Sequence, residues 1–187
     1  INGVMYSELA GRQGVNSEVV STLYGEYSVY FLTIINIPLT LAGAVPTSMI
    51  PEVSALYAQH RRKAARRKID EATQLSMFIS IPAAVGLAVL AYPITRLLFP
   101  NTNGTAGTLL LIGAVTIIFN TNSNVSNGVL QGIGKANLPM WNAAIALVIN
   151  VGLLVALLQL TSLGIYAVLV ATIVYSIVIC ILNDISM

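Results

Sequence analysis

Long apolar stretches without charge alternate along this chain with short polar segments. Residues 27–51, 72–95, 97–134 and 136–183 contain no Asp, Glu, Lys or Arg. A helix of about 20 apolar residues is long enough to cross a bilayer. We therefore predict an all-α, polytopic membrane bundle of about five transmembrane helices, at residues 27–50, 74–92, 108–133, 141–158 and 165–182.

The composition agrees with this pattern. Hydrophobic residues make up 56% of the chain and charged residues 9%, and the mean hydropathy is +0.82. Soluble domains carry about 25% charged residues, which keep their surfaces solvated. Residues 27–187 are thus predicted to form the bundle, while the more polar residues 1–26 are predicted to be an extracytoplasmic loop with one short helix. The chain starts at Ile1 without a signal-peptide pattern, and we interpret it as a piece of a longer protein.

The segment 51–71 concentrates the positive charge. It holds six of the nine basic residues, namely Arg61, Arg62, Lys63, Arg66, Arg67 and Lys68. Basic loops stay on the cytoplasmic side of a membrane, so we predict a cytoplasmic connection that lies as a helix on the membrane surface, among anionic lipid headgroups. Because apolar stretches flank it on both sides, membrane lipid is the expected partner and nucleic acid is not.

A polar stripe runs along the third predicted span. It consists of Gly113, Thr116, Asn120, Asn124, Asn127 and Gln131, spaced three or four residues apart. On a helix these residues share a face roughly 80° wide and about 27 Å long. Amides are costly in hydrocarbon without partners, so the stripe faces either a water-filled cavity or a neighbouring helix. We favour the cavity, and we add Asn36 and Asn150 as further residues of a substrate path.

Two prolines interrupt the first predicted span. Pro38 and Pro46 lack an N–H and clash with the carbonyls four residues earlier, those of Ile34 and Ala42. Such breaks are tolerated at membrane depth where neighbouring helices or water satisfy the carbonyls. The two prolines are predicted to act as hinges, with a static kink as the alternative.

Features of an enzyme are missing from the sequence. The predicted spans contain no acid or base, His60 and Cys180 are single, and no phosphate-binding loop or nucleophile elbow occurs. We therefore expect no catalytic activity, no cofactor and no metal site.

Three stretches together resemble a known superfamily: INIPLTLAGAVPTSMIPEVSALYA (35–58), SIPAAVGLAVLAYPITRLLFP (80–100) and NGVLQGIGKANLP (127–139). They are similar to the polysaccharide exporters of the multidrug/oligosaccharidyl-lipid/polysaccharide superfamily, and most of all to its stage V sporulation protein B group, related to the MurJ lipid II flippases. The resemblance runs from about Tyr24 to Asn183. It implies two six-helix lobes around a central cavity, with these five spans as helices eight to twelve and the N-terminal lobe missing.

The resemblance also implies a function. Members are expected to flip polyprenyl-linked sugars across the bacterial plasma membrane by alternating access, so a lipid-linked glycan is the expected substrate. MurJ-type members carry an arginine where this chain has Thr33, which leaves a glycan other than that of lipid II open. The alternatives are a cation-coupled drug or metabolite exporter of the same superfamily, and a non-transporting scaffold for envelope-synthesis enzymes.

Overall fold

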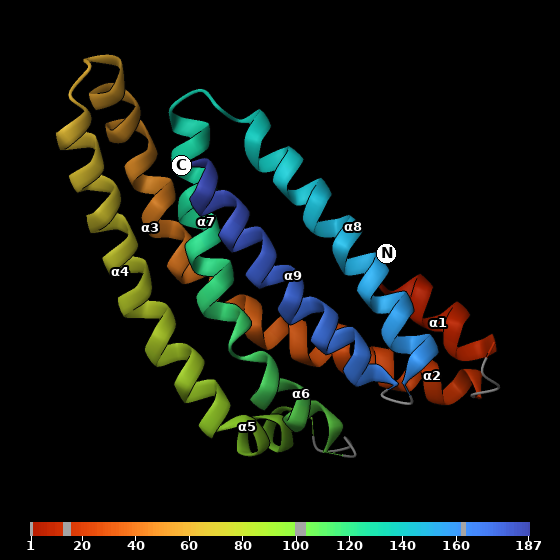
Figure 1. Ribbon diagram of the computed structural model, residues 1–187. Coiled ribbons are helices and arrows are strands. Elements are labelled where there is room, and N and C mark those ends of the chain that lie inside the picture. The colour runs from red at the N-terminus through yellow and green to blue at the C-terminus, as the bar shows by residue number, and fades with distance from the viewer. Residues whose placement is uncertain (1, 13–15, 100–103, 162–163) are drawn as a thin grey trace.

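The computed structural model describes residues 2–12, 16–99, 104–161 and 164–187, and all of its regular elements are helical (Figure 1). In chain order these are α1 (Asn2–Arg12), α2 (Ser17–Gly25), the π-helical segment η1 (Glu26–Phe31), α3 (Leu32–Ala58), α4 (Arg62–Val89), α5 (Ala91–Leu98), α6 (Thr105–Gly113), α7 (Thr116–Gly132), α8 (Asn137–Leu160) and α9 (Ile165–Ser186).

Four helical stretches in the described part of the chain are long and apolar enough to cross a membrane: Glu18–Ala58, Arg62–Val89, Asn137–Leu160 and Ile165–Ser186. Helices α6 and α7, bent by 47° at a short break, make a fifth if the pair is counted as one span. The predicted all-α polytopic bundle is confirmed, and the chain is a multi-pass membrane protein.

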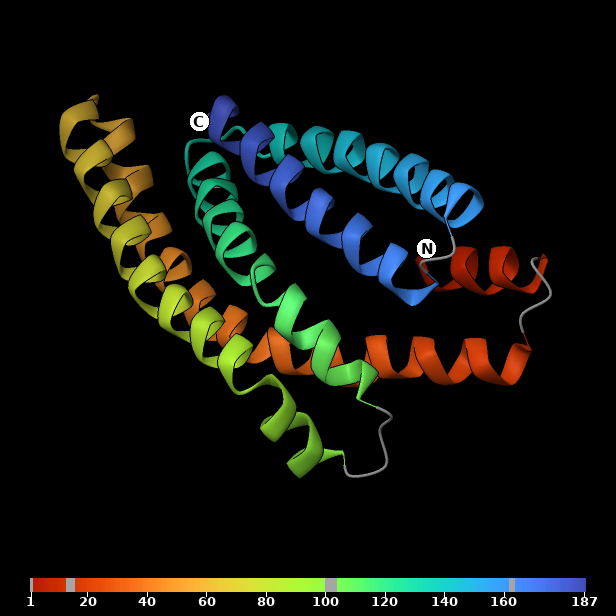
Figure 2. The same ribbon diagram turned by 60° about the horizontal axis from the view of Figure 1, so that its bottom comes forward.

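The helices pack in two groups that meet along α7. Helices α3 and α4 form an antiparallel hairpin, and α7 packs against both of them (Figures 1 and 2). Helix α9 lies on the other side of α7 and pairs with α8 along its length. The C-terminus therefore lies at the same end of the bundle as the α7–α8 turn (Figure 1).

The first predicted span is longer than the sequence suggested. Helix α2, η1 and α3 form one continuous helical stretch of 41 residues, Glu18–Ala58. Residues 1–26 thus contain two helices instead of one, with residues 1 and 13–15 outside the described part of the chain. The side chain of Asn16 caps α2 by accepting a hydrogen bond from Glu18 N at 3.0 Å. Burial of Tyr27 and Phe31 then makes the following π-helical turns part of the core.

The basic segment also differs from the expectation. Helix α3 ends at Ala58 and α4 begins at Arg62, so the cations lie on a tight turn and on the first turns of α4 instead of on a separate surface helix. His60 adopts the left-handed backbone conformation in this turn, with φ 57°. The physical reason is packing: Val53 of α3 and Ala65 of α4 are both buried, which draws the segment into the hairpin.

The third predicted span is broken between Gly113 and Thr116. Gly113 is buried where α6 crosses η1, and a Cβ there would lie 2.1 Å from Phe31 Cε2. Only glycine permits this approach. Thr116 Oγ1 donates a hydrogen bond to Gly113 O at 2.7 Å, which satisfies a carbonyl at the break. The first two residues of the predicted stripe thus belong to the bend and not to a straight polar face.

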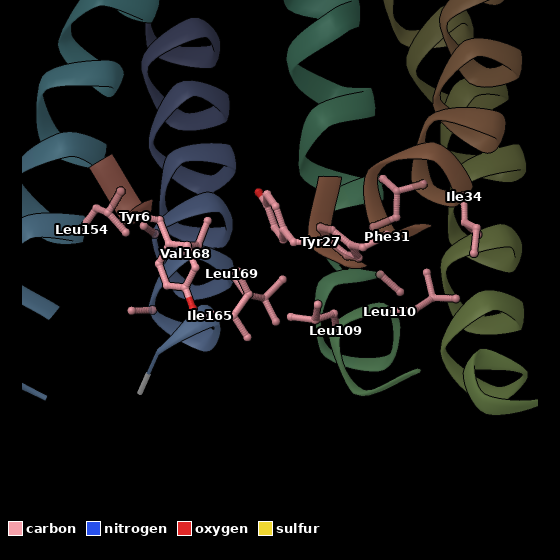
Figure 3. Packing of buried hydrophobic residues seen from close by; sticks show 14 of the residues in the cluster. Tyr6, Tyr27, Phe31, Ile34, Leu109, Leu110, Leu154, Ile165, Val168 and Leu169 are labelled. Carbon is pink, nitrogen blue, oxygen red and sulfur yellow. The ribbon is translucent and has the colours of Figure 1, made fainter. Parts of the chain in front are cut away.

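The main core lies at the end of the bundle that holds α1, η1 and α6. Tyr6, Tyr27, Phe31, Leu109 and Leu169 are buried there together (Figure 3). The aromatic rings of this core follow one another, with centroids 5.3 Å apart between Tyr27 and Phe31. At the opposite end a smaller cluster of Ala72, Val125 and Val129 joins α4 to α7. The space between α3, α7 and α9 is left for polar side chains.

Candidate functional site

A polar cavity of about 840 Å³ lies between α3, α7 and α9, with a contribution from α8. We call it the polar cavity. Its lining combines amides and hydroxyls with small and apolar side chains: Asn36, Leu39, Thr40, Gly43, Pro46, Thr47, Ile50, Asn120, Ser123, Asn124, Asn127, Gly128, Gln131, Ala143, Tyr175 and Ile179.

The α7 wall carries the four amides of the predicted stripe, Asn120, Asn124, Asn127 and Gln131. Asn124 and Gln131 are exposed, and Asn120 and Asn127 are half-buried. Of these four amides, only Asn127 forms a side-chain hydrogen bond within the described part of the chain, and its partner is Asn183. Free amides on a membrane-spanning helix face water, a polar ligand or a further part of the protein, because lipid would leave their hydrogen-bonding groups unpaired.

The α3 wall was only partly recognised in the sequence. Asn36 lines the cavity, and so do Thr40, Gly43, Thr47 and Ile50, which follow it at spacings of three or four residues. This spacing places them on one face of a helix, so the same test that found the α7 stripe finds this one. The two threonines bond to their own helix, Thr40 Oγ1 to Ile37 O at 2.8 Å and Thr47 Oγ1 to Gly43 O at 2.8 Å.

Asn150 does not belong to this cavity. Its side chain is 3% exposed, and its Nδ2 donates a hydrogen bond to Ala171 O at 2.8 Å. It joins α8 to α9, and this position outside the polar cavity does not support its predicted place on a substrate path. A lone amide in an apolar helix typically serves helix–helix contact, and only the pairing of α8 with α9 showed which partner it takes.

Asn183 holds the three C-terminal helices together. Its Nδ2 donates to Ser123 Oγ and to Asn127 Oδ1, both at 2.8 Å, and its Oδ1 accepts from Asn142 Nδ2 at 2.9 Å. The side chain is fully buried. This group of four residues, which we call the Asn183 clasp, borders the polar cavity through Ser123 and Asn127. Helix–helix bonding, the alternative interpretation of the stripe, therefore applies to one of its amides.

Two acids lie just outside the predicted spans but within the longer helical stretches of the structure. Asp184 accepts hydrogen bonds from Asn122 Nδ2 at 2.7 Å and from Ser126 Oγ at 2.6 Å, which ties α9 to a second face of α7. Glu26 is 5% exposed, and its Oε2 has no hydrogen-bond partner in the described part of the protein. Both were placed outside the spans because α9 was predicted to end at residue 182 and the first span to begin at residue 27.

Pro46 shows how the structure accommodates a proline inside α3. Helix α3 continues through Pro38, Pro46 and Pro51 without a break. The carbonyl of Ala42, which Pro46 leaves without its helical donor, accepts a hydrogen bond from Ser76 Oγ of α4 at 3.3 Å. The expectation that a neighbouring helix satisfies this carbonyl is thus confirmed, whereas hinge motion at Pro38 and Pro46 remains a prediction.

Comparison with known proteins assigns the family. The family model described as MatE matches residues 15–156, which is most of the chain. The chain belongs to the MatE family. It is therefore a member of the superfamily that the sequence motifs indicated, and its α3 to α7 lie entirely within the MatE match.

Several curated proteins are similar to this MatE chain. Lipid II flippase MurJ of Bacillus subtilis (strain 168) is 28% identical over 157 residues, which cover 81% of this chain and 28% of that protein. Probable lipid II flippase MurJ of Rhizobium meliloti (strain 1021) is 30% identical over 109 residues, covering 56% and 20%. Stage V sporulation protein B of B. subtilis is 21% identical over 170 residues, covering 91% and 32%. The chain spans less than a third of the length of each relative. No solved structure matches it significantly.

Proposed function

We propose that this chain is the second lobe of a flippase that moves a lipid-linked oligosaccharide or cell-envelope polysaccharide precursor across the bacterial plasma membrane by alternating access. The polar cavity is the observation that carries the proposal. Its two facing helices present Asn36 from α3 and Asn120, Asn124 and Gln131 from α7. Amides both donate and accept hydrogen bonds, which suits sugar hydroxyls. The MurJ relatives, which are named as lipid II flippases, support the substrate class.

The missing partner of the cavity is, in this proposal, the N-terminal lobe of the same protein. Asn36, Asn124 and Gln131 are exposed on membrane-spanning helices. Contact with lipid at these positions would cost free energy, because the amides would have no hydrogen-bond partners. A second lobe facing them would enclose a water-filled path between the two. Pro38 and Pro46 would then allow α3 to bend between the inward-open and outward-open states.

The test removes one amide from each wall. Asn36→Leu with Asn124→Leu in the full-length protein keeps the branched side-chain shape and removes two side-chain amides that form no hydrogen bond within the described part of the chain. Flipping of a lipid-linked oligosaccharide in proteoliposomes is expected to slow about tenfold or more, since a hydrogen bond contributes about 1 kcal/mol. Asn137→Leu, an exposed amide outside the cavity, is the matched control and should leave the rate unchanged. Normal flipping by the folded double variant would refute the role of the cavity.

A cation-coupled drug or metabolite exporter is the second candidate, and the buried carboxyl of Glu26 favours it. A buried carboxylate oxygen without a hydrogen-bond partner is a position at which a coupling cation can bind. Export of cationic dyes that depends on an ion gradient and is lost in Glu26→Gln would favour this candidate. Accumulation of lipid-linked precursors on depletion of the protein would favour the flippase.

The orientation completes the proposal. The turn at His60 and the α7–α8 turn with Lys135 lie at the same end of the bundle (Figure 1), and together they hold seven of the nine basic residues. By the positive-inside rule this end is cytoplasmic. The main aromatic core is then at the extracytoplasmic end. A non-transporting scaffold would use the same basic end to bind partner enzymes, and neutralising it would abolish that binding while the amide variants remained active.

A further inference from the structure

A second recess, which we call the basic groove, lies at the end of the bundle opposite the aromatic core. It has a volume of about 490 Å³ and is separated from the polar cavity by α7. Arg62, Lys63 and Arg66 line it from the first turns of α4, and Lys135 lines it from the α7–α8 turn. Asp70 is the one acidic side chain among the described lining residues, so the lining side chains carry four positive charges and one negative charge.

The six cations of the basic segment are not equivalent. Lys68 Nζ lies 3.1 Å from Glu71 Oε2 and 3.4 Å from Glu52 Oε1, and Arg67 Nε lies 3.4 Å from Glu71 Oε1. These two residues are outside the groove and already have anionic partners. The four groove cations, by contrast, form no ion pair with any carboxylate in the described part of the protein. The charge of the groove therefore remains available to a ligand.

The start of α4 makes this charge unfavourable without a ligand. The N-terminus of a helix carries a partial positive charge and is normally capped or followed by acidic residues. In α4 the cap residue, Arg61, makes no side-chain capping bond, and the first turn contains no acid. Arg62, Lys63 and Arg66 add to the positive end of the helix. A bound anion would offset both contributions.

The remaining lining identifies the class of anion. Ile69, Val129 and Ile133 add apolar side chains to the lining of the groove, and Tyr57 adds an aromatic ring. Further along α4, Phe78, Ile81 and Val85 are exposed apolar side chains on a membrane-spanning helix. A phospholipid matches this arrangement, because its phosphate can contact the cations of the groove while its acyl chains contact the apolar side chains further along α4. A free phosphate would contact only the cations.

We propose that the basic groove binds the phosphate headgroup of an anionic phospholipid of the inner leaflet. Arg62, Arg66 and Lys135 contact the phosphate, and the glycerol backbone rests on Ile69 and Ile133. The site is separate from the transport path, and it depends on the proposed function only for the assignment of the leaflet.

The experiment compares two charge-matched variants of the full-length protein in detergent. Arg62→Gln with Arg66→Gln removes two arginines of the groove, and Arg61→Gln with Arg67→Gln removes two arginines of the same segment outside it. Binding of short-chain phosphatidylglycerol, with phosphatidylcholine as the reference lipid, is measured by native mass spectrometry. At roughly fivefold per cation, the groove variant is expected to lose about 25-fold in affinity and the control less than threefold. Lys135→Gln, on a different segment, is expected to weaken binding about fivefold.

Four results would overturn the proposal. Equal losses in the two double variants would show diffuse surface attraction, and equal binding of phosphatidylcholine would show that charge is irrelevant. Inorganic phosphate that competes as well as the lipid would show an ion site. An acidic protein that co-purifies with the wild type and not with the groove variant, without any difference in lipid binding, would show a protein-docking surface. Unchanged thermal stability of all variants excludes a folding defect as the cause of lost binding.

Discussion

The Asn183 clasp makes a quantitative prediction about what holds α7, α8 and α9 together. Replacing Asn183 by Leu keeps the number of side-chain heavy atoms and the branching at Cγ, and it removes three hydrogen bonds, those with Ser123, Asn127 and Asn142. Hydrogen bonds between membrane helices contribute about 0.6 kcal/mol each on average, so the loss is about 2 kcal/mol. It should not be much larger, because Asn142 Nδ2 keeps Leu182 O at 3.1 Å and Ser186 Oγ at 2.9 Å as acceptors.

Thermal unfolding of the detergent-solubilised chain measures this loss. For 150–250 residues, 1 kcal/mol corresponds to roughly 2–4 °C in Tm, so Asn183→Leu is expected to lower Tm by about 4–8 °C. Asn124→Leu is the matched control, because it makes the same replacement on an exposed amide without hydrogen bonds in the described chain, and it should leave Tm within about 2 °C. Equal Tm values for the two variants would refute the reasoning that the buried amide network stabilises the bundle.

Three further predictions concern packing, the proline carbonyl and orientation. Gly113→Ala places a Cβ 2.1 Å from Phe31 Cε2 and is expected to lower the free energy of unfolding by about 1–3 kcal/mol through overpacking. Gly152→Ala is the control and should be neutral or stabilising, because a Cβ there would meet no neighbouring atom within 4 Å. A tolerated Gly113→Ala would show that α6 and η1 are further apart. Ser76→Ala is expected to destabilise by about 1 kcal/mol, but not in a Pro46→Ala background, where the helix itself supplies the donor for Ala42 O; additive effects in this double-mutant cycle would contradict the link. His60→Cys in a Cys180→Ser background should react with a membrane-impermeant maleimide in inverted vesicles and not in intact cells, and labelling of intact cells would reverse the proposed orientation.

Much of the architecture could be predicted from the sequence because lipid imposes a simple rule. Charge is excluded from spanning helices, so the uncharged stretches mark where helices lie and the cations of 61–68 mark a turn between two of them. The ends of helices were less predictable. Neither Glu26 nor Asp184 terminates its helix: Glu26 is buried inside the continuous stretch Glu18–Ala58, and Asp184 accepts hydrogen bonds from Asn122 and Ser126.

The candidate site was also partly predictable from the sequence. Spacing along the chain determined which amides share a face, so the α7 stripe was visible in the sequence, and the equivalent α3 face from Asn36 to Ile50 was visible too, although it was not recognised. Spacing says nothing about what a face meets. Asn150 and Asn124 are both amides in apolar helices, yet one is bonded to Ala171 O and the other lines a cavity.

The sequence by itself determined that lipid surrounds most of this protein, where its apolar stretches lie and which polar residues share a helix face, because each follows from local composition and the geometry of a helix. Only the tertiary structure decided the partner of every polar group. The packing of Gly113 against Phe31, the capture of the Ala42 carbonyl by Ser76 and the meeting of the α4 cations with Lys135 in the basic groove all depend on residues far apart in the chain. Such pairs are fixed by packing, and packing is not encoded in any one segment.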